Sequence, residues 1–193
     1  MNSLEYSLSD DDIENALVKS GYFLANEIYI ITYNELENID ISTLPRGSCI
    51  VILYRTTDSY GHWTAIYRPL GTNRIFFFDS MGGYTDNDLY DEDIFPHNEQ
   101  VGQTRRILTE GLYDSGYTVE YIDSNYVCQS QKRGINTCGK WCVFFLIFAK
   151  ALNIKGLESL KRFLRLIKIE YKNNGLTLDD FVNEYYISLL NKK

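Results

Sequence analysis

The chain contains few histidines and few prolines, and both shortages limit what it can be. Only 2 His accompany the 4 Cys among 193 residues, and no Cys–x–x–Cys pair occurs. We therefore expect no metal site and no cofactor. With only 3 Pro, no Ser/Gly-rich stretch and no internal repeat, the chain offers no candidate linker. The sequence predicts a single domain over residues 1–193.

Long apolar segments are also missing. No apolar stretch follows a basic N-terminus, so we expect no secretory signal. The longest apolar run, Trp141–Leu152, is too short to span a bilayer and is interrupted by Lys150. Four cysteines in a chain without such a signal indicate free thiols in a reducing compartment. We expect a protein that is neither secreted nor embedded in a membrane.

Positive charge is in deficit, since the formal net charge is −7. This balance argues against a general polyanion-binding protein. Acidic residues gather in 85–99 and basic residues in 150–172. The basic segment fits a helix face for nucleic acid, although such runs are more often a solvated surface. The sequence leaves both interpretations open.

One stretch, from Thr137 to Leu152, organises the rest of the chain. Apolar residues fill nearly every position after Lys140, which predicts a helix buried on all sides. Cys138 stands where the preceding loop becomes this helix. Unpaired backbone N–H groups and the helix dipole favour the thiolate there, and the thiolate is the reactive form of cysteine. Taken alone, Cys138 fits better with a small buried hydrophobic residue, as most free cysteines are, and the rest of the chain has to change that balance.

The order of the other elements indicates an α+β fold, because strands cluster rather than alternate strictly with helices. Continuous apolar strands predict a sheet covered on both faces. We expect a central mixed, mainly antiparallel sheet packed by helices, with Cys138 at the N-terminus of the buried central helix. Segment 27–38 has strand composition, but its periodicity is ambiguous. The remaining predicted elements are a helix starting after Ser9, strands 49–55, 62–68 and 74–79, a helix in 101–113, a strand at 117–122, and helices 157–169 and 178–190.

A cysteine nucleophile needs a base and a third group that orients the base. His62 begins a predicted strand, whereas His97 stands in the acidic segment. Asp79 ends the next strand, 17 residues after His62. If these strands pair as a hairpin, the start of one lies beside the end of the other, which suits an imidazole–carboxylate pair. Asp79 also fits an aspartate that merely begins a turn.

In combination these residues resemble the adenain-type cysteine proteases, which are the adenovirus maturation proteases and their relatives in large DNA viruses and virophages. That family shares its fold with the SUMO-specific, ubiquitin-like-protein proteases. Papain-type enzymes differ, because their cysteine precedes their histidine. The resemblance runs from the first helix through the central helix and leaves the last two helices unmatched. It is carried by Gly61-His62-Trp63, Phe78-Asp79, Gln131 and Cys138-Gly139.

The resemblance implies a catalytic role for each of four residues. Cys138 would be the nucleophile, His62 the general base, and Asp79 the group that orients His62. Gln131, seven residues before Cys138, would give its side-chain amide to the oxyanion hole together with the backbone N–H of Cys138. Gln129 is the less favoured substitute for Gln131. The implied state of Cys138 is a free, accessible thiol.

Two further residues are the predicted substrate-binding residues, Trp63 and Gly139. By the resemblance, Trp63 would wall a narrow channel over the scissile bond, and such a channel suits glycine-rich substrate ends. Trp63 also fits a half-buried aromatic residue of a strand, and both interpretations can hold together.

The implied activity is that of a thiol endopeptidase that cleaves viral capsid precursors at small or Gly-containing sites during virion maturation. It would act in the virion and in the virus factory of the host cytoplasm, as a monomer. Removal of ubiquitin or a ubiquitin-like protein from host proteins is an alternative for the same site. An acyltransferase and a noncatalytic binding module are alternatives on the same fold. A peptide or DNA activator is a further expectation, with Cys128 and segment 150–172 as the candidate counterparts.

Overall fold

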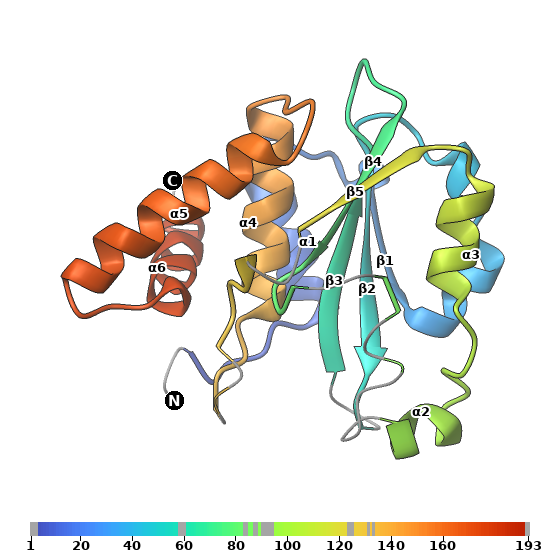
Figure 1. Ribbon diagram of the computed structural model, residues 1–193, viewed down its shortest axis with the longest axis horizontal. Helices are drawn as coiled ribbons and strands as arrows, with labels where there is room; N and C mark the ends of the chain where they lie inside the picture. Colours follow the sequence, from blue (N-terminus) through green and yellow to red (C-terminus); the bar gives the residue numbers. More distant parts are fainter. Residues whose placement is uncertain are drawn as a thin grey trace.

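The computed structural model describes residues 4–57, 61–82, 85–86, 89, 95–122, 126–130, 132 and 134–191. Within these residues, five strands form one sheet in the order β1-β2-β3-β4-β5 (Figure 1). The three central strands pair antiparallel, and each edge strand pairs parallel with its neighbour. The strands are β1 (Ile28–Thr32), β2 (Cys49–Arg55), β3 (Gly61–Tyr67), β4 (Arg74–Asp79) and β5 (Thr118–Tyr121).

Helices cover both faces of this sheet (Figure 1). Helices α1 and α4 pack against one face, and α5 and α6 lie on the outer side of α4. Helix α3 and two 3-10 turns cover the other face, where they enclose a separate apolar cluster. The predicted α+β class and the predicted two-sided covering are therefore confirmed. The helices are α1 (Asp10–Lys19), α2 (Phe95–Gln100), α3 (Ile107–Asp114), α4 (Cys138–Ala151), α5 (Glu158–Asn173) and α6 (Leu178–Leu190).

Some predicted boundaries are wrong. The helical spacing in 101–113 produces a helix only from Ile107, and the ambiguous segment 27–38 divides into strand β1 and a 3-10 turn, Tyr33–Asn38. The acidic segment 85–99, which is absent from the predicted elements, leads into the short helix α2, Phe95–Gln100. Capping explains why other boundaries are accurate. Ser9 forms a capping box at the start of α1, and Thr177 does so at the start of α6.

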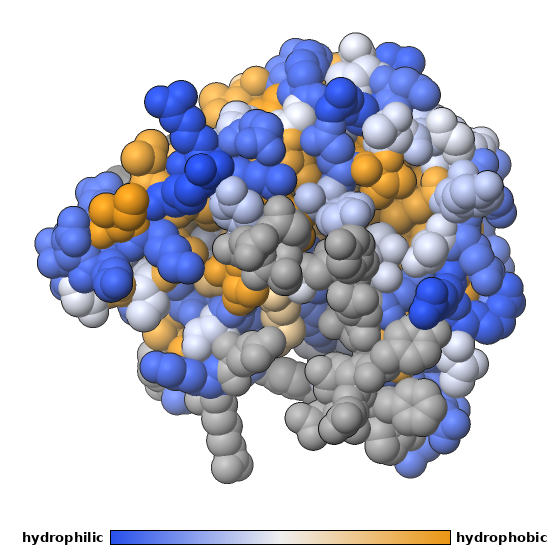
Figure 2. All heavy atoms as spheres, viewed as in Figure 1, coloured by the Kyte–Doolittle hydropathy of each residue, from blue (hydrophilic) through white to orange (hydrophobic). Residues whose placement is uncertain are grey.

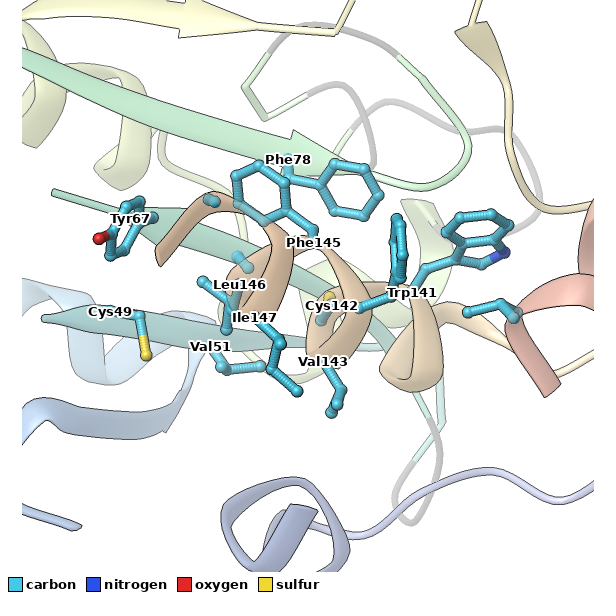
Figure 3. Packing of buried hydrophobic residues seen from close by; sticks show 14 of the residues in the cluster. Cys49, Val51, Tyr67, Phe78, Trp141, Cys142, Val143, Phe145, Leu146 and Ile147 are labelled. Atoms are coloured by element: carbon cyan, nitrogen blue, oxygen red, sulfur yellow. The ribbon is translucent and has the colours of Figure 1, made fainter. Parts of the chain in front are cut away.

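Helix α4 lies against the sheet through an apolar face that Figure 3 shows from close by. The rings of Phe78 on β4 and Phe145 on α4 stack with their centroids 4.6 Å apart. Cys142 and Leu146 are fully buried in the same cluster. Burying one large apolar side chain contributes about 1.5–3 kcal/mol, so this interface fixes the position of α4. The N-terminus of α4 is held at one end of the sheet in consequence.

The last two helices are part of the same core. An aromatic cluster joins α4 to α5 and α6, with ring centroids 5.1–5.9 Å apart. Its members are Phe144, Phe148, Phe163, Phe181 and Tyr185. On the face shown in Figure 2, hydrophobic residues are scattered among hydrophilic ones. None of the described helices is both long enough and apolar enough to cross a membrane.

Candidate active site

His62 and Asp79 form a buried pair at the end of two adjacent strands. Strands β3 and β4 place Asp79 opposite Thr64, two residues from His62. The His62 Nε2 atom lies 2.8 Å from Asp79 Oδ1, and the two residues are 6% and 4% exposed. With the carboxylate as the acceptor, Nε2 donates this hydrogen bond and Nδ1 is left as the basic nitrogen. The pairing expected from the hairpin spacing is confirmed.

Asp79 also begins a turn, so both interpretations of this residue hold. Its Oδ1 accepts a hydrogen bond of 2.8 Å from the backbone N–H of Met81, and its carbonyl accepts one from Gly82. The turn fixes the carboxylate, and the carboxylate in turn fixes the plane of the imidazole. The second histidine, His97, lies apart from this pair on helix α2.

Cys138 is the first residue of α4, and the first turn of this helix packs against β3. A Cβ atom on Gly139 would lie 3.3 Å from Trp63 Cδ1 and 3.1 Å from Leu8 Cβ. The Cys142 thiol, one turn further on, donates to the carbonyl of Trp63. Gly139 and Trp63 are in contact, and each is next in the sequence to a candidate catalytic residue. The candidate nucleophile Cys138 precedes Gly139, and the candidate base His62 precedes Trp63.

The expectation of an accessible Cys138 is wrong, since this residue is only 5% exposed. Cys138 belongs to the same buried cluster as Leu8 and Trp63, and the next residue, Gly139, packs closely against both.

The other three cysteines are buried as free thiols. Burial raises the pKa of Cys49, Cys128 and Cys142 above the usual range for thiols. Cys128 is therefore poorly placed to join an activating peptide. Nowhere in the described part of the chain do three or more His, Cys, Asp or Glu residues gather in a way that could hold a metal ion.

Alkylation rates should separate Cys138 from these three thiols. We expect iodoacetamide to modify Cys138 first at neutral pH, because each unit of pKa elevation lowers the thiolate fraction of the others about tenfold. Peptide mass spectrometry after timed quenching measures the four rates. In urea all four cysteines should react, which controls for intrinsic reactivity. Equal rates in the folded protein would remove the nucleophile assignment.

An open groove of about 700 Å³ runs from the start of α1 along edge strand β1 to β3. At β3 it is lined by Gly61 and Trp63, the two neighbours of His62. The Trp63 ring N–H donates to the carbonyl of Leu8 at 3.0 Å, and the residue is 5% exposed. Trp63 is thus both a core aromatic residue and a wall of the groove. The other lining residues include Leu8, Asp10, Ile31, Glu35, Leu53 and Arg55.

The two glutamine candidates differ in what the structure says of them. Gln131 lies outside the described residues, so its role stays a prediction. Gln129 is buried, and its Oε1 accepts a hydrogen bond of 2.9 Å from the Ser80 hydroxyl. Its amide nitrogen donates to the carbonyl of Ile135 at 3.3 Å. Gln129 therefore braces the loop before α4 against the turn that follows Asp79.

Two buried charged residues beside the start of α4 were not identified from the sequence. Lys140, in the first turn of α4, is 2% exposed and donates to Asn183 on α6 at 3.0 Å. Asp179, in the first turn of α6, is 2% exposed and accepts hydrogen bonds from Thr137 and from the backbone of Ser130. Burial lowers the pKa of Lys140 and raises the pKa of Asp179. Nothing in the sequence distinguished Asp179 as a functional residue, because an acidic residue is common in the first turn of a helix.

The basic segment 150–172 is divided between two helices. Lys150 belongs to α4 and forms an ion pair of 2.6 Å with Glu27. Lys161 and Arg165 belong to α5 and lie 5.5 Å and 5.4 Å from the ring centre of Tyr126. The nucleic-acid interpretation of this segment stays a prediction.

Comparison with known proteins gives one sequence relative and distant structural neighbours. No protein-family model matches the chain. It is 34% identical over 128 residues to the uncharacterized protein V9 of Sputnik virophage, covering 64% of this chain and 70% of V9. The ASFV pS273R protease is similar with a TM-score of 0.43 and 14% identity, over 78% of this chain and 61% of the protease, less than two thirds of its length. ChlaDub1 from Chlamydia trachomatis is similar with a TM-score of 0.44 and 15% identity, over 100% and 96% of the two chains. Structural similarities with TM-scores below 0.5 do not support any catalytic assignment. The proposed chemistry therefore rests on the residues of this chain.

Proposed function

We propose that this chain, which belongs to the same family as protein V9 of Sputnik virophage, is a cysteine protease with Cys138 as nucleophile and His62 as base. The observation that supports this most directly is the buried His62–Asp79 pair, 2.8 Å apart, beside the helix that begins with Cys138. A buried carboxylate on imidazole is the arrangement that fixes the tautomer of a general base. The noncatalytic alternative gives no reason to bury this pair beside the helix that begins with Cys138.

The residues present can carry each step of peptide hydrolysis. His62 Nδ1 takes the thiol proton, and the Cys138 sulfur attacks the peptide carbonyl carbon. The backbone N–H groups at the start of α4 are the proposed donors to the oxyanion, and Asp79 would stabilise the imidazolium. The imidazolium gives its proton to the leaving amine, and a thioester remains. Water, deprotonated by His62, then attacks the thioester and releases the acid and the thiol.

The substrate is proposed to have small or glycine residues at the scissile bond. His62, Trp63 and Cys138 are each at most 6% exposed, which leaves little room for a side chain beside the reacting carbonyl. The groove that ends at Trp63 offers a path for an extended peptide. The virophage relative indicates a viral setting, and within it we propose capsid precursors as substrates, cleaved in the virus factory or the virion during maturation. Ubiquitin-like proteins are the alternative substrates, because the same catalytic site would cleave them.

Parallel proteolysis assays distinguish these substrates. The purified chain is incubated with capsid precursors and with ubiquitin-like fusion proteins, with Cys138→Ala as the control, and new termini are identified by mass spectrometry. The proposal expects cleavage of the precursors after a small residue or glycine. Cleavage of the fusions alone would favour the deconjugating alternative. Acyl transfer from a thioester without any proteolysis would point to the acyltransferase.

Gln131→Ala should lower kcat by about 10²–10³ with little change in KM, because an oxyanion donor acts mainly in the transition state. Kinetics on a Gly-Gly aminomethylcoumarin peptide measure both constants. Gln129→Ala is the matched control. It removes two buried hydrogen bonds, so we expect it to lower Tm while kcat changes far less. A selective loss of kcat in Gln129→Ala, with full kcat in Gln131→Ala, would instead favour Gln129 over Gln131 as the glutamine that serves the oxyanion hole.

A further inference from the structure

The carboxylate of Asp179 joins two segments that are far from it in the sequence. Its Oδ1 accepts a hydrogen bond of 2.5 Å from the Thr137 hydroxyl, and its Oδ2 accepts one of 2.9 Å from the backbone N–H of Ser130. Both oxygens are thus used, and the residue is 2% exposed. Hydrogen bonds to a charged acceptor are shorter and stronger than neutral ones, particularly where water is excluded.

The two partners of Asp179 bracket the loop that leads to the nucleophile. Thr137 directly precedes Cys138 and is the N-cap residue of α4, a position where threonine commonly caps its own helix. Here the Thr137 side chain makes no capping bond to α4 and donates to Asp179 instead. Ser130 stands at the other end of the loop, next to Gln129. The carboxylate therefore holds both ends of this loop against α6.

Asp179 is itself held in a fixed position. The capping box between Thr177 and Asp180 sets the first turn of α6. One turn later, Phe181 packs edge-to-face against Phe144 of α4 with the ring centroids 5.3 Å apart. Lys140 adds a second link between the helices through its hydrogen bond to Asn183. The last two helices thus form a rigid support behind the first turn of α4.

We infer that Asp179 is a positioning residue for the proposed protease site: it holds the loop and the start of α4 so that the backbone N–H groups there meet the oxyanion. This inference rests on the proposed function. The inference assigns the C-terminal helices a role in catalysis, because α6 places the Asp179 carboxylate against the loop. Oxyanion donors act only in a narrow range of positions, so a small displacement of the loop is costly.

Asp179→Ala and Thr137→Val test the inference, because the first removes both acceptor oxygens and the second removes the donating hydroxyl. We expect kcat on the Gly-Gly aminomethylcoumarin peptide to fall about 10- to 100-fold in both, with KM nearly unchanged. Iodoacetamide labelling of Cys138 should change by less than about twofold, because displacement of iodide forms no oxyanion. Thr137→Ser, which restores the hydroxyl, should recover most of kcat.

Asp86→Ala is the matched control. It removes another buried carboxylate, which accepts hydrogen bonds from Tyr33 and from the backbone of Thr109 and not from the loop, so Tm should fall while kcat stays within about twofold. The inference is overturned if Asp179→Ala and Thr137→Val retain full kcat. It is also overturned if kcat, labelling and Tm all fall together in these two variants, because a general loss of structure would then explain the loss of kcat. A Cys138→Ala protein that still hydrolyses the peptide would instead refute the proposed function.

Discussion

Replacing Cys138 with alanine should lower kcat for a Gly-Gly aminomethylcoumarin peptide by about 10⁵–10⁶-fold, because loss of the nucleophile removes the thioester pathway. Stability should change little, since the substitution deletes one sulfur atom at the edge of the core. Continuous fluorescence assays measure the rate, and thermal unfolding measures Tm. Retained turnover in Cys138→Ala would exclude a cysteine protease.

Cys142→Ala is the control for this experiment. It removes a thiol from the same helix, one turn further on, where the side chain is completely buried and donates to Trp63. Its loss should cost about 1–2 kcal/mol and a few degrees of Tm in a chain of this size. The rate should be nearly unchanged, because Cys142 faces the core and not the groove. The two alanine variants thus separate chemistry from packing.

Asp79→Asn should have the second largest effect, a loss of about 10³–10⁴ in kcat. Asparagine keeps the size of the side chain and can still accept from Met81. It can also present an N–H group to His62 Nε2, which then becomes an acceptor and moves the ring proton to Nδ1. The imidazole would keep its place and lose its ability to take the thiol proton. The pH dependence of kcat/KM reports this change directly.

Asp86→Asn provides the comparison for a buried carboxylate outside the proposed site. Asp86 is 3% exposed and accepts hydrogen bonds from the Tyr33 hydroxyl and the backbone of Thr109. Its replacement should lower Tm and leave the pH profile unchanged. If Asp79→Asn behaves in the same way, the His62–Asp79 pair is structural and the proposed mechanism fails.

Much of this fold follows from local signals. The apolar run of α4, the β-branched strand β2 and the two capping boxes fix where elements lie, because these patterns leave one favourable placement. The His62–Asp79 contact also follows from spacing, since a hairpin with one short loop sets its own register. The parallel pairing of β1 and β5 does not follow, because each depends on partners distant in the sequence.

The support behind the site could not be predicted. Asp179 and Lys140 act through contacts between α4 and α6, and no spacing in the sequence brings these helices together. The burial of Cys138 depends in the same way on Leu8 and Trp63, which arrive from other elements. A helix N-terminus in the sequence indicates where a thiol is reactive, whereas tertiary packing decides how exposed that thiol is.

The most direct test of the central claim is covalent trapping with a peptide vinyl sulfone that ends in glycine. Such a reagent reacts with a thiolate at the position of the scissile bond. The account predicts one adduct per chain, mapped by mass spectrometry to Cys138, formed rapidly in the native protein and slowly in His62→Ala. Adducts on Cys49, Cys128 or Cys142, or a rate at Cys138 that does not depend on His62, would contradict it.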